Sequence, residues 1–342
     1  MKRIPTLDGW RGIAIAMVLF DHVQDSLLGH YLHPWTKTGL HGVSIFFVLS
    51  GYLITSKLLT EQMEDGAPLR AFYARRFFRL LPAAWLFLAV LGVIAALAHN
   101  RWTSWPSVLA CLFFVRNLVH ISDGIDGHFW SLSIEEQFYL VWPALLLMMG
   151  MRRARWFAIV AAVSCEIYRW FAWHTAINPV AGFQTQFHAD ALLTGCILAL
   201  MLADDGIRER VRGMVQLLWV PAAVVFLACV VFFQNANPLI EDVSIAVLLC
   251  WTSLRPETTA GRMLAWEPLA WLGAISYSVY LWQEMFMEMH DPMLLAVGIP
   301  LFSIGSYYLV ERPCVRLGHR LTAGWKAKDG RGAWEEQTGQ PA

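Results

Sequence analysis

Two ionisable side chains stand far apart on one apolar stretch near the N-terminus. Arg11 precedes His22 by eleven residues in LDGWRGIAIAMVLFDHV, and Asp21 adjoins the histidine. On a helix that rises about 1.5 Å per residue they lie roughly 16 Å apart, about half of a bilayer's hydrocarbon core. Titratable groups at that depth are costly and commonly functional. Because imidazole exchanges a proton near neutral pH, His22 is a candidate general base; the alternative is a structural hydrogen bond to a neighbouring helix.

A cluster of arginines forms the second candidate site. Arg75, Arg76 and Arg79 fall within about one helical turn of FYARRFFRLLP, just before an apolar run. Guanidinium groups keep their charge and bind phosphate through two hydrogen bonds at once. The cluster therefore suits a polyphosphate ligand such as a nucleotide or coenzyme A. The alternative is an anchor that fixes topology and contacts anionic lipid headgroups.

Adjacent acidic residues occur inside the apolar segment HFWSLSIEEQFYLVWP. Glu135 and Glu136 point about 100° apart on a helix, so at most one of them readily faces a given cavity. Ser131 and Tyr139 lie one turn on either side of Glu135. A helix N-terminus would favour acidic groups here through its dipole. The functional alternative is that Glu135, or Asp21, orients His22, or that Glu135 binds an acceptor hydroxyl.

Two later apolar runs carry polar side chains that could line a cavity. These residues are His188, Asp190, Tyr277 and Gln283. The run near 39–58 instead contains small residues that predict close helix packing, namely Gly42, Ser44, Ser50 and Gly51. The six cysteines show no CxxC spacing, so we expect neither a disulfide framework nor a metal site.

The elements that position these groups are predicted to be transmembrane helices. The 342 residues are 57% hydrophobic and 15% charged, whereas a soluble domain has about 25% charged residues. We predict an all-α polytopic protein in a lipid bilayer, and no basic block indicates nucleic acid. Ten spans are expected, near 11–29, 39–58, 80–98, 130–149, 155–173, 187–203, 215–233, 239–254, 266–285 and 293–310.

Basic residues orient these spans. With both termini in the cytoplasm, only four of the 26 Lys and Arg residues lie outside: Lys37, Arg101, Arg116 and Arg169. Counting the shorter run 105–119 as another span would place the later basic loops on the outer side of the membrane. We therefore predict a re-entrant or interfacial segment there. Lys2 and Arg3 precede a retained first helix with no convincing cleavage site. Residues 321–342 are predicted to form a short flexible cytoplasmic tail.

Five motifs in order carry a family resemblance. LDGWRGIAIAMVLFDH, GVSIFFVLSGYLI, ARRFFRLLP, WSLSIEEQFYLVWP and SYSVYLWQ resemble the acyltransferase-3 family of bacterial membrane O-acyltransferases, and ERP at 311–313 also fits. The resemblance covers about Leu7 to Pro313 and implies one domain over 1–320. It implies transfer of an acyl group, usually acetyl, from cytoplasmic acyl-CoA to a hydroxyl of a glycan or other acceptor, in the cytoplasmic (inner) membrane.

The family's motifs also suggest residue roles. Its Arg and His separated by ten residues fall on Arg11 and His22, and its paired arginines fall on Arg76 and Arg79. We therefore expect His22, Arg11, Glu135 and Asp21 in catalysis and the arginine cluster at the donor. Predicted substrate contacts are Trp130, Ser131, Gln137, Tyr139, His188, Asp190, Tyr277 and Gln283. Many members have His where this chain has Gln283, and Arg is frequent at the place of His188.

Other functions remain open at this stage. A transporter of a glycan or lipid could use the intramembrane His and Glu as a proton relay, although no inverted repeat is visible. A receptor or sensor is a third class, but short loops leave no evident output domain. Within the acyltransferase interpretation, the acceptor could be a small secondary metabolite, and a covalent acyl-His22 intermediate is a variant. The sequence does not decide the oligomeric state.

Overall fold

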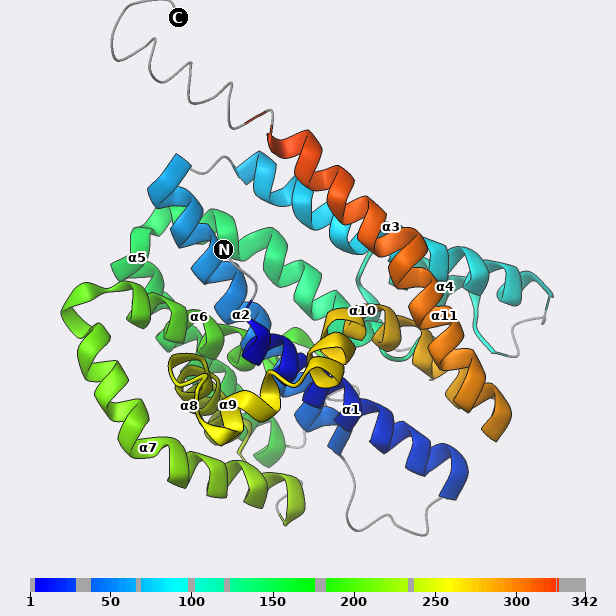
Figure 1. The fold of residues 1–342 in the computed structure, drawn as a ribbon. Coiled ribbons are helices and arrows are strands. Elements are labelled where there is room, and N and C mark those ends of the chain that lie inside the picture. The colour runs from blue at the N-terminus through cyan, green and yellow to red at the C-terminus, as the bar shows by residue number, and fades with distance from the viewer. Residues whose placement is uncertain are drawn as a thin grey trace, which may run out of the picture.

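The computed structural model describes residues 4–28, 38–65, 69–97, 102–119, 124–175, 183–232, 237–323 and 325. Every regular element in these ranges is helical, which confirms the predicted all-α class (Figure 1). The α-helices are α1 (Pro5–Leu28), α2 (Thr38–Asp65), α3 (Leu69–Leu97), α4 (Trp105–Leu112), α5 (Phe129–His174), α6 (Ala189–Ala203), α7 (Asp205–Val231), α8 (Pro238–Leu254), α9 (Thr259–Leu264), α10 (Glu267–Met287) and α11 (Ile299–Ser306).

Several of these helices are long and apolar enough to cross a membrane. They are Thr38–Glu61, Leu69–Leu97, Asp205–Val231 and the C-terminal helix Leu294–Ala323, which contains α11. The count of ten spans stays a prediction. Two local features agree with the predicted positions of the spans. First, α5 is interrupted at Gly150, where φ is 71°, between the predicted spans 130–149 and 155–173. The eight residues of α4 extend only about 12 Å, too short for a span.

The centre of the bundle is formed by α1, α2, α6 and α10. Helix α1 packs against both α10 and α2, and α2 packs along α6. Helix α5 lies on α6, and α7 pairs with α8 at the left edge of Figure 1. At the opposite side, α3 runs beside the C-terminal helix. The N-terminal halves of α1 and α3, the C-terminal half of α2 and the C-terminal helix thus come together from distant parts of the sequence.

Glycines allow the central backbones to touch. A Cβ atom at Gly51 would lie 1.9 Å from the Leu192 carbonyl oxygen, and one at Gly195 would lie 2.0 Å from that of Val48. Side chains at these positions would push α2 and α6 apart. The packing role predicted for Gly51 is thereby confirmed, as it is for Gly42, where a Cβ would lie 2.5 Å from the Ala14 carbonyl oxygen. Ser50 faces a cavity instead, as described below.

The C-terminal helix extends slightly further than expected. It continues through Ala323, and the Thr322 side chain is buried with 2% exposure. Residues 321–323 therefore belong to the helical body rather than to a tail, because Thr322 packs inside and its hydroxyl bonds the Gly318 carbonyl. The remainder of the predicted tail, apart from residue 325, lies outside the described residues.

Candidate active site

A cationic cavity lies among α1, α2, α3 and the C-terminal helix. Its volume is about 540 Å³. Basic side chains from three helices line it: Arg11, Lys57, Arg75, Arg76 and Arg79. Two acidic residues, Asp8 and Glu61, are also in the lining, so positive charge is in excess. The predicted arginine cluster and Arg11, separated by more than sixty residues in the sequence, therefore meet at one cavity.

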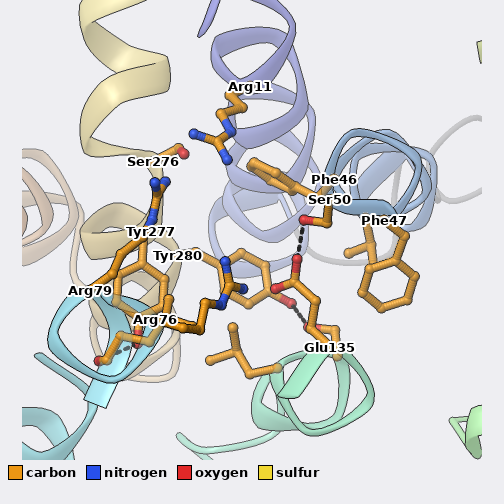
Figure 2. Close-up of a pocket in the computed structure, with 14 residues that line it drawn as sticks. Arg11, Phe46, Phe47, Ser50, Arg76, Arg79, Glu135, Ser276, Tyr277 and Tyr280 are labelled. Atoms are coloured by element: carbon orange, nitrogen blue, oxygen red, sulfur yellow. Dashed lines mark hydrogen bonds between the residues drawn. The ribbon is translucent and has the colours of Figure 1, made fainter. Parts of the chain in front are cut away.

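A smaller cavity of about 70 Å³ adjoins the first. Both are lined by Arg11, Ser50, Arg76 and Arg79. Figure 2 shows Arg11 from α1 and Arg76 and Arg79 from α3 projecting toward the same space. The remaining polar lining consists of Ser131, Glu135, Ser276, Tyr277 and Tyr280, and the apolar lining of Val43, Phe46, Phe47, Leu80 and Leu132. The lining is thus cationic in the larger cavity and partly apolar in the smaller one.

Two of the arginines are held by acidic and aromatic partners. Arg75 Nη2 lies 2.6 Å from Glu61 Oε2, so its charge is largely balanced inside the protein. Arg76 Nη2 lies 3.5 Å from Glu136 Oε1, and its guanidinium carbon stands 3.5 Å from the centre of the Tyr139 ring. Stacking on an aromatic face fixes a guanidinium while leaving its edge free for an anion.

Glu135 faces the smaller cavity with a defined orientation. Its Oε1 atom accepts a hydrogen bond from the Ser50 hydroxyl (Figure 2). The same atom accepts a second bond, of 2.5 Å, from the Tyr139 hydroxyl. Tyr139 itself lines the larger cavity. These two donors account for one carboxylate oxygen, so this side chain is positioned from α2 and from its own helix. Ser50, assigned from the sequence to helix packing, is therefore part of the candidate site.

A polar chain leads away from the smaller cavity. The Ser131 and Tyr280 hydroxyls are 2.5 Å apart, and they lie 3.0 Å and 3.4 Å from the His128 carbonyl oxygen. Because each hydroxyl has one proton, one of them donates to the other and the second donates to the carbonyl. The His128 ring bonds through Nδ1 to Glu284, and its backbone N–H donates to Glu284 Oε2 at 2.6 Å. Tyr277, another predicted contact, lines the smaller cavity and donates to the Leu80 carbonyl.

His22 lies apart from these groups. It is partly buried, and it is not among the residues that line either cavity. Its Nδ1 atom is 2.8 Å from the Val18 carbonyl oxygen. Since a carbonyl only accepts, Nδ1 carries the hydrogen, and Nε2 of the neutral ring has a lone pair. Asp21 lies against α2, with Oδ2 2.6 Å from where a Cβ at Gly39 would be.

Other predicted substrate contacts lie outside the linings of the two cavities. The Trp130 ring packs at a tilt against His188 and Phe183, at centroid distances of 4.8 Å and 4.9 Å. Gln137 ties a connecting segment to its helix, because Nε2 donates to the Phe114 carbonyl at 2.8 Å. The remaining two predicted residues are Asp190, which is paired with Arg169 at 2.5 Å, and Gln283, which is fully buried in α10.

Sequence reasoning missed several residues of the site. Ser50 was assigned to packing because it stands among small residues, and Tyr280 was not among the predicted substrate contacts. His128 and Glu284 were not considered, although Glu284 is an acidic residue within an otherwise apolar helix, which is a usable signal. Among the described residues, no group of three or more His, Cys, Asp or Glu side chains is placed to hold a metal ion.

Fold and site together define a helical membrane protein with a cation-lined internal cavity. The sequence matches the acyltransferase-3 family, described as an acyltransferase domain, over residues 4–310, and the chain belongs to this family. It is 31% identical over 365 residues to YrhL of Bacillus subtilis, named as a candidate peptidoglycan O-acetyltransferase, covering 93% of this chain and 56% of that protein.

A second relative carries a similar name. The chain is 28% identical over 334 residues to the peptidoglycan O-acetyltransferase OatA of Listeria monocytogenes, with 86% of this chain and 51% of that protein covered. The chain thus spans about half the length of these curated relatives. No solved structure matches it.

Proposed function

We propose that this chain is a membrane O-acyltransferase that moves an acetyl group from cytoplasmic acyl-CoA to a hydroxyl of a glycan. The observation that carries the proposal is the cavity where Arg11, Arg76 and Arg79 converge beside the small, partly apolar cavity. Coenzyme A has phosphates at one end and the thioester at the other, so such a ligand would place its phosphates among the guanidinium groups. Family membership and the names of the relatives support acyl transfer.

The size of the smaller cavity supports a short acyl group. Its volume of about 70 Å³ is enclosed on the apolar side by Phe46, Phe47 and Leu132. A close-packed aromatic wall of this kind excludes extra methylene groups, because inserting them would displace ring atoms. An acetyl group would fit beside Glu135 and Tyr280. Glu135 would then bind near the reacting carbonyl or the acceptor hydroxyl.

His22 is the proposed general base. Its Nε2 lone pair takes the proton of the acceptor hydroxyl while the hydroxyl oxygen bonds to the thioester carbonyl carbon. The carbon–sulfur bond then breaks, and the leaving thiolate takes the proton from His22. Arg11, which lines both cavities, would stabilise negative charge on the bound donor. The cytoplasmic membrane, both termini in the cytoplasm and an acceptor outside follow from the distribution of basic residues and belong to the same proposal.

The proposal is tested with purified protein, radiolabelled acetyl-CoA and isolated peptidoglycan glycan strands. We expect release of free coenzyme A thiol and label in the glycan. His22→Gln should lower the rate of acetyl transfer by about 10²-fold or more, as expected for loss of a general base. The variant should still bind acetyl-CoA. The matched control is His174→Gln, because His174 is exposed and makes the same local bond, from Nδ1 to the Trp170 carbonyl at 2.7 Å.

Two results would contradict the proposal. Folded protein that releases no thiol would favour the transporter alternative, which needs no acetyl donor. Full activity of His22→Gln would instead reject the base assignment while leaving acyl transfer intact.

A further inference from the structure

The larger cavity has a region that does not border the smaller one. Along α2, Ser50 lines both cavities, whereas Leu53, Ile54 and Lys57 line only the larger. Ser50 and Lys57 are seven residues apart in the sequence, so their backbone positions are separated by roughly 10 Å along the helix. His319 of the C-terminal helix also lines only the larger cavity. A ligand that fills both cavities therefore has a further part that lies beside Lys57 and His319.

Lys57 supplies this region with a cation whose charge is only loosely balanced. Its Nζ atom lies 4.0 Å from Glu61 Oε1, which is longer than a hydrogen bond. Glu61 bonds Arg75 instead, at 2.6 Å through Oε2. The Lys57 side chain is 40% exposed, against 8% for that of Arg75. Lys57 therefore keeps its ammonium hydrogens available for an anion, while Arg75 is held by its acidic partner.

Apolar side chains complete the lining of this region. Ile54, Phe72 and Val315 line the larger cavity and not the smaller one. A ligand that suits the region has an anionic group for the ammonium and a flat or apolar body for these side chains. The nucleotide end of coenzyme A has both, because its ribose carries an adenine base and a phosphate monoester. The pantetheine arm and the thioester extend from the other side of the diphosphate.

We propose that Lys57, assisted by His319, binds the ribose phosphate of the acyl-CoA donor and so selects a coenzyme A thioester over an acyl group on phosphopantetheine. The inference rests on the proposed function, in which Arg11, Arg76 and Arg79 hold the diphosphate. With the thioester directed to the smaller cavity, the ribose phosphate extends into the remaining part of the larger one. A phosphate monoester carries about −1.5 to −2 charge at pH 7, and an ammonium group binds it as a point charge.

The test compares acetyl-CoA with acetyl-dephospho-CoA, which lacks only the ribose phosphate. Both compounds displace radiolabelled acetyl-CoA from the full chain in detergent, which gives a Kd for each. The parent should bind the dephospho compound about tenfold or more weakly, the loss expected for one hydrogen bond between charged groups. Lys57→Gln should raise the Kd of acetyl-CoA by a similar factor and leave that of the dephospho compound within about twofold, because the variant and the shortened ligand remove the same interaction.

Arg320→Gln is the matched control, since Arg320 is an exposed cation next to His319 that lines neither cavity. It should leave the ratio of the two Kd values unchanged. His319→Gln should lower the ratio by about twofold, because His319 is exposed and water screens its charge. If Lys57→Gln does not fold, His319→Gln carries the same comparison.

The outcomes separate this inference from the proposed function. A parent protein that binds acetyl-CoA and acetyl-dephospho-CoA equally, or a ratio that neither variant lowers, would overturn this inference alone. Phosphatidic acid, a lipid with a phosphate monoester headgroup, is added in a parallel series. If it displaces acetyl-CoA from the parent and not from Lys57→Gln while the two donors bind alike, the residues hold a lipid headgroup and the inference is wrong. A folded parent that does not bind acetyl-CoA would contradict the proposed function and this inference with it.

Discussion

Removal of Arg79 should weaken binding of acetyl-CoA while leaving the fold intact. Arg79 lines both cavities, whereas Arg75 is already paired with Glu61 at 2.6 Å. A hydrogen bond between charged partners contributes about 1.5–3 kcal/mol. Arg79→Ala should therefore raise the Kd for acetyl-CoA by about 10- to 100-fold, using 1.4 kcal/mol per factor of ten. Arg79→Lys should give an intermediate value, since lysine keeps the charge and loses the bidentate geometry.

The assay is equilibrium binding of radiolabelled acetyl-CoA to protein in detergent at two salt concentrations. Higher salt should weaken binding to the parent more than to Arg79→Ala, because the variant has one fewer charge for salt to screen. Arg153→Ala is the control, as Arg153 is an exposed arginine outside the linings of both cavities. An unchanged Kd in Arg79→Ala would refute the donor assignment and return this arginine to the role of a topology anchor.

Three further outcomes are expected. Phe46→Leu should enlarge the smaller cavity and improve transfer of propionyl relative to acetyl by about tenfold in kcat/KM, measured by competition between the two donors. Gly195→Ala should lower the free energy of unfolding by about 1–3 kcal/mol, because a Cβ there meets the neighbouring backbone, whereas Gly213→Ala, with open space, should be neutral or stabilising in thermal unfolding.

Bonds from Arg155 and a backbone N–H lower the pKa of Asp204, so its stabilisation is present above the ordinary aspartate pKa and lost as pH falls. Asp204→Asn should accordingly lower Tm at pH 7, and the difference should shrink on acidification.

The sequence was sufficient for the class of fold because hydrophobic run length and basic residues report on the bilayer directly. It also predicted the break in α5, since Arg152, Arg153 and Arg155 interrupt the apolar pattern beside Gly150. The number of spans is harder to derive, because a buried helix next to other helices can be as apolar as one facing lipid. Thr322 illustrates a related limit: its burial depends on contacts that the polar local sequence does not indicate.

The candidate site was predictable only in part, because the sequence does not show how each helix is rotated about its own axis. Along α2, Ser50 and Gly51 are adjacent small residues, yet Ser50 bonds Glu135 while Gly51 contacts the backbone of α6. Neighbouring positions on a helix differ by about 100°, so which of them meets a cavity depends on how the helix is turned in the bundle. Arg11 and Arg76 could be predicted because a charged residue in an apolar segment is energetically costly and therefore stands out in the sequence. This signal does not depend on which direction the side chain points around the helix.

The separation between His22 and the cavities has a mechanistic consequence. From the smaller cavity the hydrogen bonds run through the Ser131–Tyr280 pair to His128 and then to Glu284. His22 lines neither cavity, so if it is the base, the thioester carbonyl has to move from beside Glu135 toward His22 before transfer. Rotation of the Tyr280 ring away from Ser131 and the His128 carbonyl costs one or two hydrogen bonds between neutral groups, each about 0.5–1.5 kcal/mol net. Such a cost is small enough for donor binding to supply, so this tyrosine is suited to open a passage only when acetyl-CoA is in place.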